Sequence, residues 1–158
     1  YTRVLKGHIA VSDYKVRKSS TGSNVDQNAR KPLRKINLDY PHGTGHGVGY
    51  FLNVHEGPQS FSQKNKINLK SGMIVSNEPG YYKEGYFGIR IENLIYIKKN
   101  RFKELTMAPI EKDLIKKNML NKKETSWLNE YHLKVKKNLF RFMNSEEKTD
   151  LIDACSPI

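Results

Sequence analysis

Cysteine is almost absent from this sequence of 158 residues, since the only one is Cys155, close to the end. A single cysteine excludes an internal disulfide framework and fits a reducing compartment. The sequence also lacks a signal peptide and any apolar run long enough to span a bilayer. We therefore expect a cytoplasmic protein with no membrane partner. The length is sufficient for one domain with a hydrophobic core of its own.

Negatively charged residues are few relative to positively charged ones. The 16 Asp and Glu face 28 Lys and Arg, a net charge of +12 that raises the question of a nucleic-acid partner. The excess is spread evenly, with 14 basic and 7 acidic residues in 1–97 and 14 and 9 in 98–158. Neither an arginine-rich stripe nor an aromatic RNA-binding signature accompanies it. We therefore interpret the excess as a solvated, lysine-rich surface and predict no nucleic-acid partner.

Helical periodicity marks the beginning of the chain. Residues 1–12 predict a helix, and because the chain opens directly into it at Tyr1 rather than Met, we expect the sequence to begin partway through a larger protein. A second helix is predicted from Ser23, with Asp26 three residues later as an imperfect capping box. Its apolar stripe includes Pro32, which should kink or shorten the helix.

The last third of the sequence predicts a long amphipathic helix. Asn121 and Glu124 form its N-terminal cap, and apolar residues follow at spacings of three and four. The apolar stripe consists of Leu128, Tyr131, Val135, Leu139 and Phe142. His132 lies off this stripe, so we expect it at the surface. A short final helix is predicted to begin at residues 145–147.

Glycine alternates with other residues between positions 43 and 49. Alternate glycines remove the side chains from one face of an extended segment, so that its backbone can approach a neighbouring strand or a ligand closely. The opposite face would then present His42, Thr44, His46 and Val48. No helix signal follows the glycines at the required place, which excludes a dinucleotide-binding fingerprint.

Two apolar runs predict strands that carry glutamates. Residues 72–75 form a short strand that delivers Glu78 just past its end, where a Pro-Gly pair should force a turn. Residues 87–97 alternate as one strand, with Arg90 and Glu92 on the same face. A returning strand is predicted at residues 103–110.

The groups that bind divalent metals concentrate in residues 41–93. Each of them alone has an ordinary explanation: Glu78 as a solvated loop acid, Glu92 as an ion-pair partner of Arg90, and His46 as the cap of a turn. An ion pair alone is a poor reason to interrupt an apolar strand, because desolvation offsets much of its attraction. Three histidines within fourteen residues are also hard to explain as core. The candidate set is His42, His46, His55, Glu78 and Glu92.

This set of side chains favours a particular chemistry. Carboxylates with an imidazole suit Mn, Co or Zn, and two such ions close together suit the hydrolysis of an amide. Nearby histidines would orient a substrate and move protons. Catalysis by a nucleophilic serine or cysteine is disfavoured, because no Gly-x-Ser-x-Gly elbow exists and Cys155 lacks a suitable neighbourhood.

Two long segments resemble a known family. HGTGHGVGYFLNVHEGP at residues 42–58 and SNEPGYYKEGYFGIRIEN at residues 76–93 are similar to the Xaa-Pro aminopeptidase (aminopeptidase P) branch of the pita-bread metallopeptidases. VLKGHIAVS at 4–12 resembles the helix that leads into that family's site. APIEKDLI and WLNEYH, at 108–115 and 127–132, resemble the short C-terminal domain of its longer cytosolic members.

The resemblance implies an α+β architecture, the pita-bread (creatinase/aminopeptidase) fold, of which this chain would hold only the C-terminal half and a small helical extension. Residues 1–107 would form the C-terminal part of the catalytic domain, and residues 108–158 the extension. The family reaction removes the N-terminal residue from a peptide with proline in second position. The implied cofactors are two divalent ions, Mn first with Co or Zn as alternatives, and the implied assembly is a homodimer.

The resemblance also implies roles for single residues. His46 and Glu78 match ligands of one ion, and Glu92 matches the carboxylate that bridges both ions. His55 matches a catalytic histidine that contacts the substrate, and His46 is assigned to the substrate-binding group with it. The remaining catalytic positions are a supporting histidine, His42, and an arginine that holds the site carboxylates, Arg90.

One family feature is missing from this sequence. The two aspartates that complete the second metal site belong to a D-G-x-x-D-x-T type segment, and nothing like it is present. Asp13, Asp26 and Asp39 lie in other contexts. We therefore expect an incomplete second site and a chain that is inactive, or nearly so, alone. Two alternatives remain: a non-catalytic pita-bread protein-interaction module, and a missing half supplied by a separate chain.

Overall fold

The computed structural model describes residues 1–51 and 53–158, which combine helices and sheet and divide into two compact units. Unit 1 is Tyr1 and Arg3–Thr106, and unit 2 is Thr2 and Met107–Ile158. The α+β class expected from the sequence is confirmed. Among the described residues, no helix combines the length and the hydropathy that a membrane span requires.

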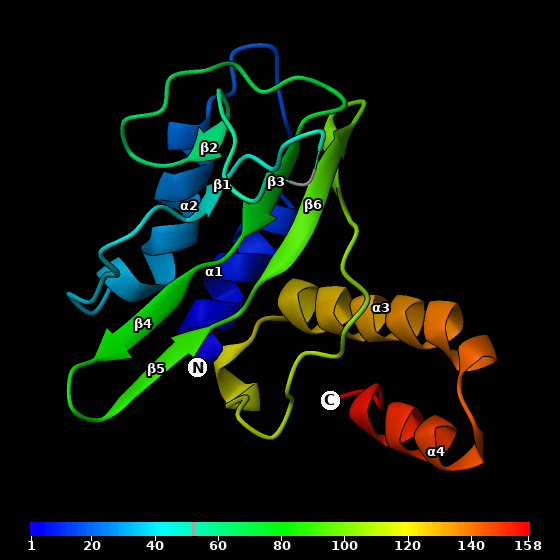
Figure 1. Ribbon diagram of the computed structural model, residues 1–158. Helices are drawn as coiled ribbons and strands as arrows, with labels where there is room; N and C mark the ends of the chain where they lie inside the picture. The colour runs from blue at the N-terminus through cyan, green and yellow to red at the C-terminus, as the bar shows by residue number, and fades with distance from the viewer. Residues whose placement is uncertain (52) are drawn as a thin grey trace. The chain divides into compact units, whose positions relative to one another are not determined.

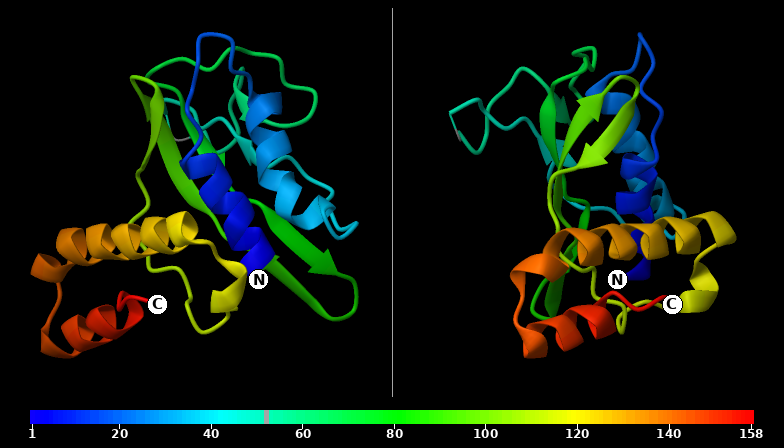
Figure 2. Two further views of the ribbon diagram at one scale, coloured as in Figure 1. Left: turned by 180° about the vertical axis from the view of Figure 1, so that it is seen from behind. Right: turned by 90° about the vertical axis from the view of Figure 1, so that its right-hand side faces the viewer.

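Two helices cover one face of the sheet in unit 1 (Figures 1 and 2). They are α1 (Thr2–Ser12) and α2 (Gly22–Arg34). The cap of α2 is Thr21, whose backbone N–H donates to Asn24 Oδ1 at 2.8 Å, so the cap predicted at Ser23 is wrong by two residues. The helix continues for two residues beyond its proline.

The central sheet is antiparallel, with strand order β3-β6-β7. Its strands are β3 (Ile74–Asn77), β6 (Asn93–Lys98) and β7 (Arg101–Glu104), so the returning strand predicted at 103–110 begins and ends earlier. Apolar side chains from both helices and all three strands form one buried core. Its members include Val11, Val25, Ala29, Val75, Ile95, Ile97 and Phe102.

The strand predicted at residues 87–97 is in fact two strands with different partners (Figure 1). β5 (Phe87–Arg90) pairs with β4 (Gly80–Lys83), whereas β6 pairs with β3. The turn predicted at Pro79 and Gly80 is also wrong. Only two residues separate the end of β3 at Asn77 from the start of β4 at Gly80. The regular pairing is therefore interrupted between β3 and β4 at Glu78, and between β5 and β6 at Glu92, which lies opposite.

Strand β1 (Gly45–His46) pairs with β2 (Ser60–Phe61) and lies against β3. A Cβ atom on Gly45 would lie 1.9 Å from the carbonyl oxygen of Ser76, so only glycine permits this approach. The close backbone approach expected from the alternating glycines is confirmed here. Beyond the two residues of β1, the extended pairing continues as one isolated bridge between Gly47 and Val75 of β3.

Unit 2 is helical, and each of its two α-helices begins with a capping box. α3 (Lys122–Leu139) starts as predicted, with Asn121 Oδ1 accepting from the backbone N–H of Lys123 and Glu124 at 2.9 and 3.0 Å. α4 (Ser145–Ala154) follows. Short 3-10 turns occur at Lys117–Met119 and Phe140–Phe142.

Two sequence expectations for unit 2 are wrong. Phe142 is 72% exposed, because α3 ends three residues before it and the periodicity of the stripe stops there. His132 is fully buried, with Nε2 accepting a hydrogen bond from the backbone N–H of Ile110 at 3.1 Å. Burial lowers the pKa of His132, so the ring is kept neutral.

Replacing Gly45 by alanine should loosen the contact between β1 and β3. Because the new Cβ would overlap the carbonyl of Ser76, we expect the free energy of unfolding to fall by about 1–3 kcal/mol in urea denaturation. Gly57→Ala is the control, since its Cβ would meet no atom within 4 Å. Equal stabilities of the two variants would contradict the close approach.

The buried histidine of α1 should make unfolding depend on pH. Burial lowers the pKa of His8 to about 4, and its Nδ1–H donates to the carbonyl of Ile91 at 3.2 Å. As the pH falls below about 6.5, His8 binds a proton in the unfolded chain while it is still neutral in the folded chain. The free energy of unfolding therefore decreases until the pH reaches the pKa of His8 in the folded chain. We expect a loss of about 2 kcal/mol between about pH 7 and about pH 5 from this group. In urea titrations, His8→Gln should lose less stability over this range than the wild type, and equal losses would refute the assignment.

Candidate metal centre

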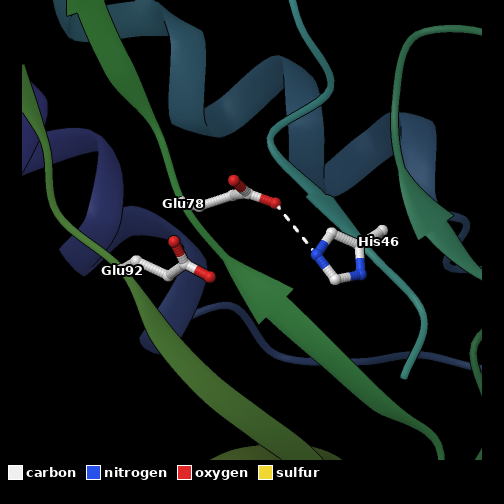
Figure 3. A group of neighbouring side chains, drawn as sticks. All are labelled: His46, Glu78 and Glu92. Carbon is white, nitrogen blue, oxygen red and sulfur yellow. Dashed lines mark ion pairs between the residues drawn. The ribbon is translucent and has the colours of Figure 1, made fainter. Parts of the chain in front are cut away.

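Three potential ligands from separate parts of unit 1 converge in the structure (Figure 3). The ligand atoms of His46, Glu78 and Glu92 all lie within 4.8 Å of one another. His46 comes from β1, Glu78 follows β3, and Glu92 precedes β6. Glu78 is buried, His46 is half-buried and Glu92 is exposed, so the cluster opens to solvent on the side of Glu92.

The register of the strands places the two glutamates together. Asn77 pairs with Asn93 at the end of one ladder, and Gly80 pairs with Arg90 at the start of the next. Between them the chain leaves regular pairing, and Glu78 and Glu92 occupy the break. Their side chains are oriented toward the same space in Figure 3.

The imidazole of His46 presents one nitrogen to the cluster. Its Nδ1 lies 3.0 Å from the carbonyl oxygen of Gly47, which can only accept, so Nδ1 donates that hydrogen bond and Nε2 is the nitrogen directed at the cluster. Nε2 faces Glu78 Oε1 at 3.4 Å. Ligating histidines in metalloproteins are commonly oriented in this way by a second hydrogen bond.

A serine connects His46 and Glu78. The Ser76 hydroxyl accepts a hydrogen bond from the backbone N–H of His46 at 2.9 Å and donates one to Glu78 Oε1, also at 2.9 Å. Ser76 therefore fixes the distance between a ligand's backbone and another ligand's carboxylate. Ser76 was not among the residues predicted from the sequence. A signal was present, because Ser76 stands two residues before Glu78 and alternate residues of an extended segment share a face.

The donor set fits a divalent cation. Two carboxylates and an imidazole are ligands that Mn, Co and Zn accept, and a cation would attract both carboxylates of the cluster. The three aspartates that the sequence places in other contexts do not join the cluster. Asp26 and Asp39 bind Arg30, and Asp13 lies 3.6 Å from Arg101.

Arg90 supports the cluster through Glu78. Its Nη1 lies 3.4 Å from Glu78 Oε2, on the carboxylate oxygen that does not face His46. Arg90 therefore forms its ion pair with Glu78, whereas the simplest interpretation of the sequence was an ion pair with Glu92. A hydrogen bond to Tyr82 and the nearby carboxylates raise the pKa of Arg90, so the guanidinium stays charged.

A hydrogen-bonded chain links His42 to this arginine through Tyr82. The Tyr82 hydroxyl accepts from Arg90 Nε at 3.0 Å and donates to His42 Nε2 at 2.8 Å, while His42 Nδ1 donates to the carbonyl of Gly43 at 2.7 Å. Sequence analysis missed Tyr82. Gly88 could have indicated this tyrosine, because Gly88 pairs with Tyr82 across the hairpin and its missing side chain leaves room for the phenol ring.

The ring of His55 lies beside that of His46, with their centroids 4.1 Å apart, and its side chain is exposed. The structure thus gathers all six residues singled out from the sequence around one space. Three form the ligand cluster, two stand in the hydrogen-bonded chain, and one borders His46 on the solvent side. Such an arrangement can bind a cation and present a histidine to a ligand arriving from solvent.

Comparison with known proteins gives the family. Residues 1–99 match the model of metallopeptidase family M24, and residues 99–158 match that of the C-terminal region of peptidase M24. A probable Xaa-Pro aminopeptidase P of Coprinopsis cinerea is 42% identical over 94% of this chain and 26% of its own length. Aminopeptidase P2 of Arabidopsis thaliana is 48% identical over 85% of this chain and 21% of its own. The chain spans about a quarter of the length of these curated relatives.

Solved structures agree with this result. The X-prolyl aminopeptidase of Caenorhabditis elegans, described as a cytosolic enzyme with a di-nuclear active site, matches with a TM-score of 0.89 and 39% identity, covering 99% of this chain and 28% of that one. The prolidase of Pyrococcus furiosus matches 70% of this chain with a TM-score of 0.63 and 32% identity, and the match covers 32% of that prolidase. Since the family model extends over residues 1–99 and the fold follows these solved structures, the chain belongs to metallopeptidase family M24 and has part of the pita-bread fold.

Proposed function

We propose that this chain is the metal-binding C-terminal part of an Xaa-Pro aminopeptidase, which releases the N-terminal residue from peptides with proline in second position. In this proposal residues 1–107 belong to the catalytic domain and residues 108–158 form its C-terminal extension. The observation that carries it is the convergence of His46, Glu78 and Glu92 in a chain whose relatives are named Xaa-Pro aminopeptidases. A non-catalytic module would have no need to keep three ligand atoms within 4.8 Å of one another.

We assign the metal ligands as the sequence suggests. His46 and Glu78 would hold one divalent ion, and Glu92 would bridge it to a second, consistent with the di-nuclear site of the Caenorhabditis elegans neighbour. When bound, such ions act as Lewis acids that polarise the scissile carbonyl. Mn is the first candidate, and the same donor set also accepts Co or Zn. This chain supplies three ligands, so the second site is incomplete.

The remaining site residues would orient ligands and substrate. Arg90 pairs with Glu78 Oε2 and so directs the other carboxylate oxygen toward the ion. His42, anchored at Nδ1, fixes the hydroxyl of Tyr82, which in turn fixes Arg90. His55 is exposed beside His46, and we propose that it contacts the peptide together with His46 and moves a proton during cleavage.

The proposal extends to the setting of the protein. A cytoplasmic location is supported by the single cysteine and by the description of the Caenorhabditis elegans neighbour as cytosolic. The substrate would be a peptide with an N-terminal Xaa-Pro sequence. A homodimer is proposed on the family resemblance alone.

Metal titration tests the proposed site. In calorimetric titration with Mn²⁺ we expect one weak site in the wild-type chain, and at least about tenfold weaker binding in Glu92→Gln, which removes a ligand charge with little change of shape. His46→Ala should remove binding. Glu84→Gln is the matched control, because Glu84 is an exposed glutamate of the β4–β5 turn outside the cluster. Binding that Glu92→Gln leaves unchanged would overturn the assignment, and two tight sites would contradict the incomplete second site.

The chain alone should hydrolyse an Xaa-Pro peptide at or below the limit of detection, because two carboxylates of the second metal site are missing from its sequence. The measurement is the release of the free N-terminal amino acid in the presence of Mn²⁺. Turnover that disappears in Glu92→Gln would contradict the expected inactivity while supporting the aminopeptidase assignment. Turnover that survives in Glu92→Gln would point to a contaminating peptidase.

A further inference from the structure

An arginine and an aspartate on α2 form a buried ion pair next to the candidate metal centre. Arg30 Nε donates to Asp26 Oδ2 at 2.8 Å, one helical turn apart, and the two residues are 3% and 0% exposed. Neither belongs to the ligand cluster, and the proposed function gives them no role. A buried ion pair is a poor source of stability, because desolvation offsets its attraction, so its retention calls for another reason.

The guanidinium of Arg30 binds the segment that carries His42. Its Nη1 donates to Asp39 Oδ1 at 2.7 Å and to the carbonyl of Tyr40 at 2.8 Å, and its Nη2 donates to the carbonyl of His42 at 2.5 Å. The guanidinium also lies 4.0 Å from the centroid of the Tyr40 ring. The Arg30 side chain therefore binds Asp39, Tyr40 and His42 to α2.

The second oxygen of Asp26 binds Thr44, which precedes the ligand strand. Asp26 Oδ1 accepts from the hydroxyl of Thr44 at 2.7 Å and from its backbone N–H at 3.3 Å. Thr44 is fully buried and is followed directly by Gly45 and His46 of β1. The position of β1 is thus fixed from its N-terminal side by a carboxylate of α2.

Thr44 also contacts the second ligand. Its carbonyl oxygen accepts a hydrogen bond from the backbone N–H of Glu78 at 2.8 Å. The contacts therefore run without a gap from Arg30 through Asp26 and Thr44 to the backbone of Glu78. His46 follows Thr44 by two residues in the sequence, and Glu78 is hydrogen-bonded to Thr44.

We propose that Arg30, held by Asp26, is a positioning residue of the metal centre: it sets the backbone from Tyr40 to Thr44 so that His46 and Glu78 face each other at ligand distance. This inference rests on the proposed metal-dependent function. Arginine is required because its planar fork reaches two carboxylates and two carbonyls at once, which the single ammonium of lysine cannot do. Opposing effects act on the pKa of Arg30: burial would lower it, but the hydrogen bonds to Asp26 and Asp39 raise it, so the charge is kept.

The test separates positioning from general stability. Arg30→Lys keeps the charge and loses the fork, and we expect its affinity for Mn²⁺ to fall about tenfold or more, measured well below its melting temperature. Arg34→Lys is the matched control, because Arg34 lies one turn later on α2 and also pairs with Asp39 but is largely exposed. It should bind Mn²⁺ within about twofold of the wild type. If Arg30→Lys lowers only the melting temperature and binds Mn²⁺ like the control, the inference is wrong.

A second pair of variants keeps the test decisive if Arg30→Lys does not fold. Thr44→Val removes the hydroxyl that binds Asp26 with little change of volume, and Thr44→Ser restores it. We expect weaker Mn²⁺ binding in Thr44→Val and recovery in Thr44→Ser. Wild-type affinity in a folded Thr44→Val protein would overturn the inference.

A measurement without metal distinguishes failure of the inference from failure of the proposed function. In the metal-free chain, imidazole ¹⁵N spectra report the hydrogen bonds that His42 Nδ1 and His46 Nδ1 each make to the next carbonyl. Arg30→Lys and Thr44→Val should change both signals, and Arg34→Lys neither. If the wild type binds no Mn²⁺, the proposed metal site fails, and these spectra alone decide the positioning role: unchanged signals reject it.

Discussion

Two antiparallel strand pairs in unit 1 share one break, and the candidate metal centre depends on it. β3 and β6 stop pairing where β4 and β5 begin, and Glu78 and Glu92 occupy the gap. The register therefore places two carboxylates side by side where regular pairing is interrupted and the backbone N–H of Ile91 still donates to the carbonyl of Pro79 at 3.3 Å. Like charges this close repel each other, and a bound cation reverses the sign of that interaction. His46 reaches the same point only because Gly45 lets β1 approach the backbone of β3.

A polar network surrounds this break on the side of the β4–β5 hairpin. His42, Tyr82 and Arg90 are connected by hydrogen bonds and end on the Glu78 carboxylate. On the opposite side, Ser76 joins the same carboxylate to the backbone of His46. Each oxygen of Glu78 thus has a partner outside the ligand set, which limits the rotation of the carboxylate. Networks of this kind restrict a site to one geometry when every member is satisfied.

The residue types and the glycine spacing were enough to predict a metal site among five residues, and the motifs at 42–58 and 76–93 carry the family resemblance that implied the α+β class and the role of Arg90. The break in the ladder was not predictable, because the apolar alternation continues through Glu92 and only the change of strand partner interrupts it. Ser23 and Asp26 resembled a helix cap, whereas Asp26 is used inside the fold. His132 lies off the helix stripe, and its burial depends on a contact with Ile110, which periodicity does not describe. In each case the deciding contact involves a second segment of the chain, which the periodicity of one segment does not describe.

The contacts of Arg30 have a consequence for the order of folding. They join residues only 9, 10 and 12 positions apart, and Asp26 reaches Thr44 across 18. The hydrogen bond from Asn77 to the carbonyl of His8 spans 69 positions. Because the entropy cost of closing a loop grows with its length, the short loops around α2 close at lower cost than the long ones. The segment that carries His42 and the β4–β5 hairpin, in which Gly80 pairs with Arg90 only 10 positions away, can therefore both form before α1 binds to the sheet.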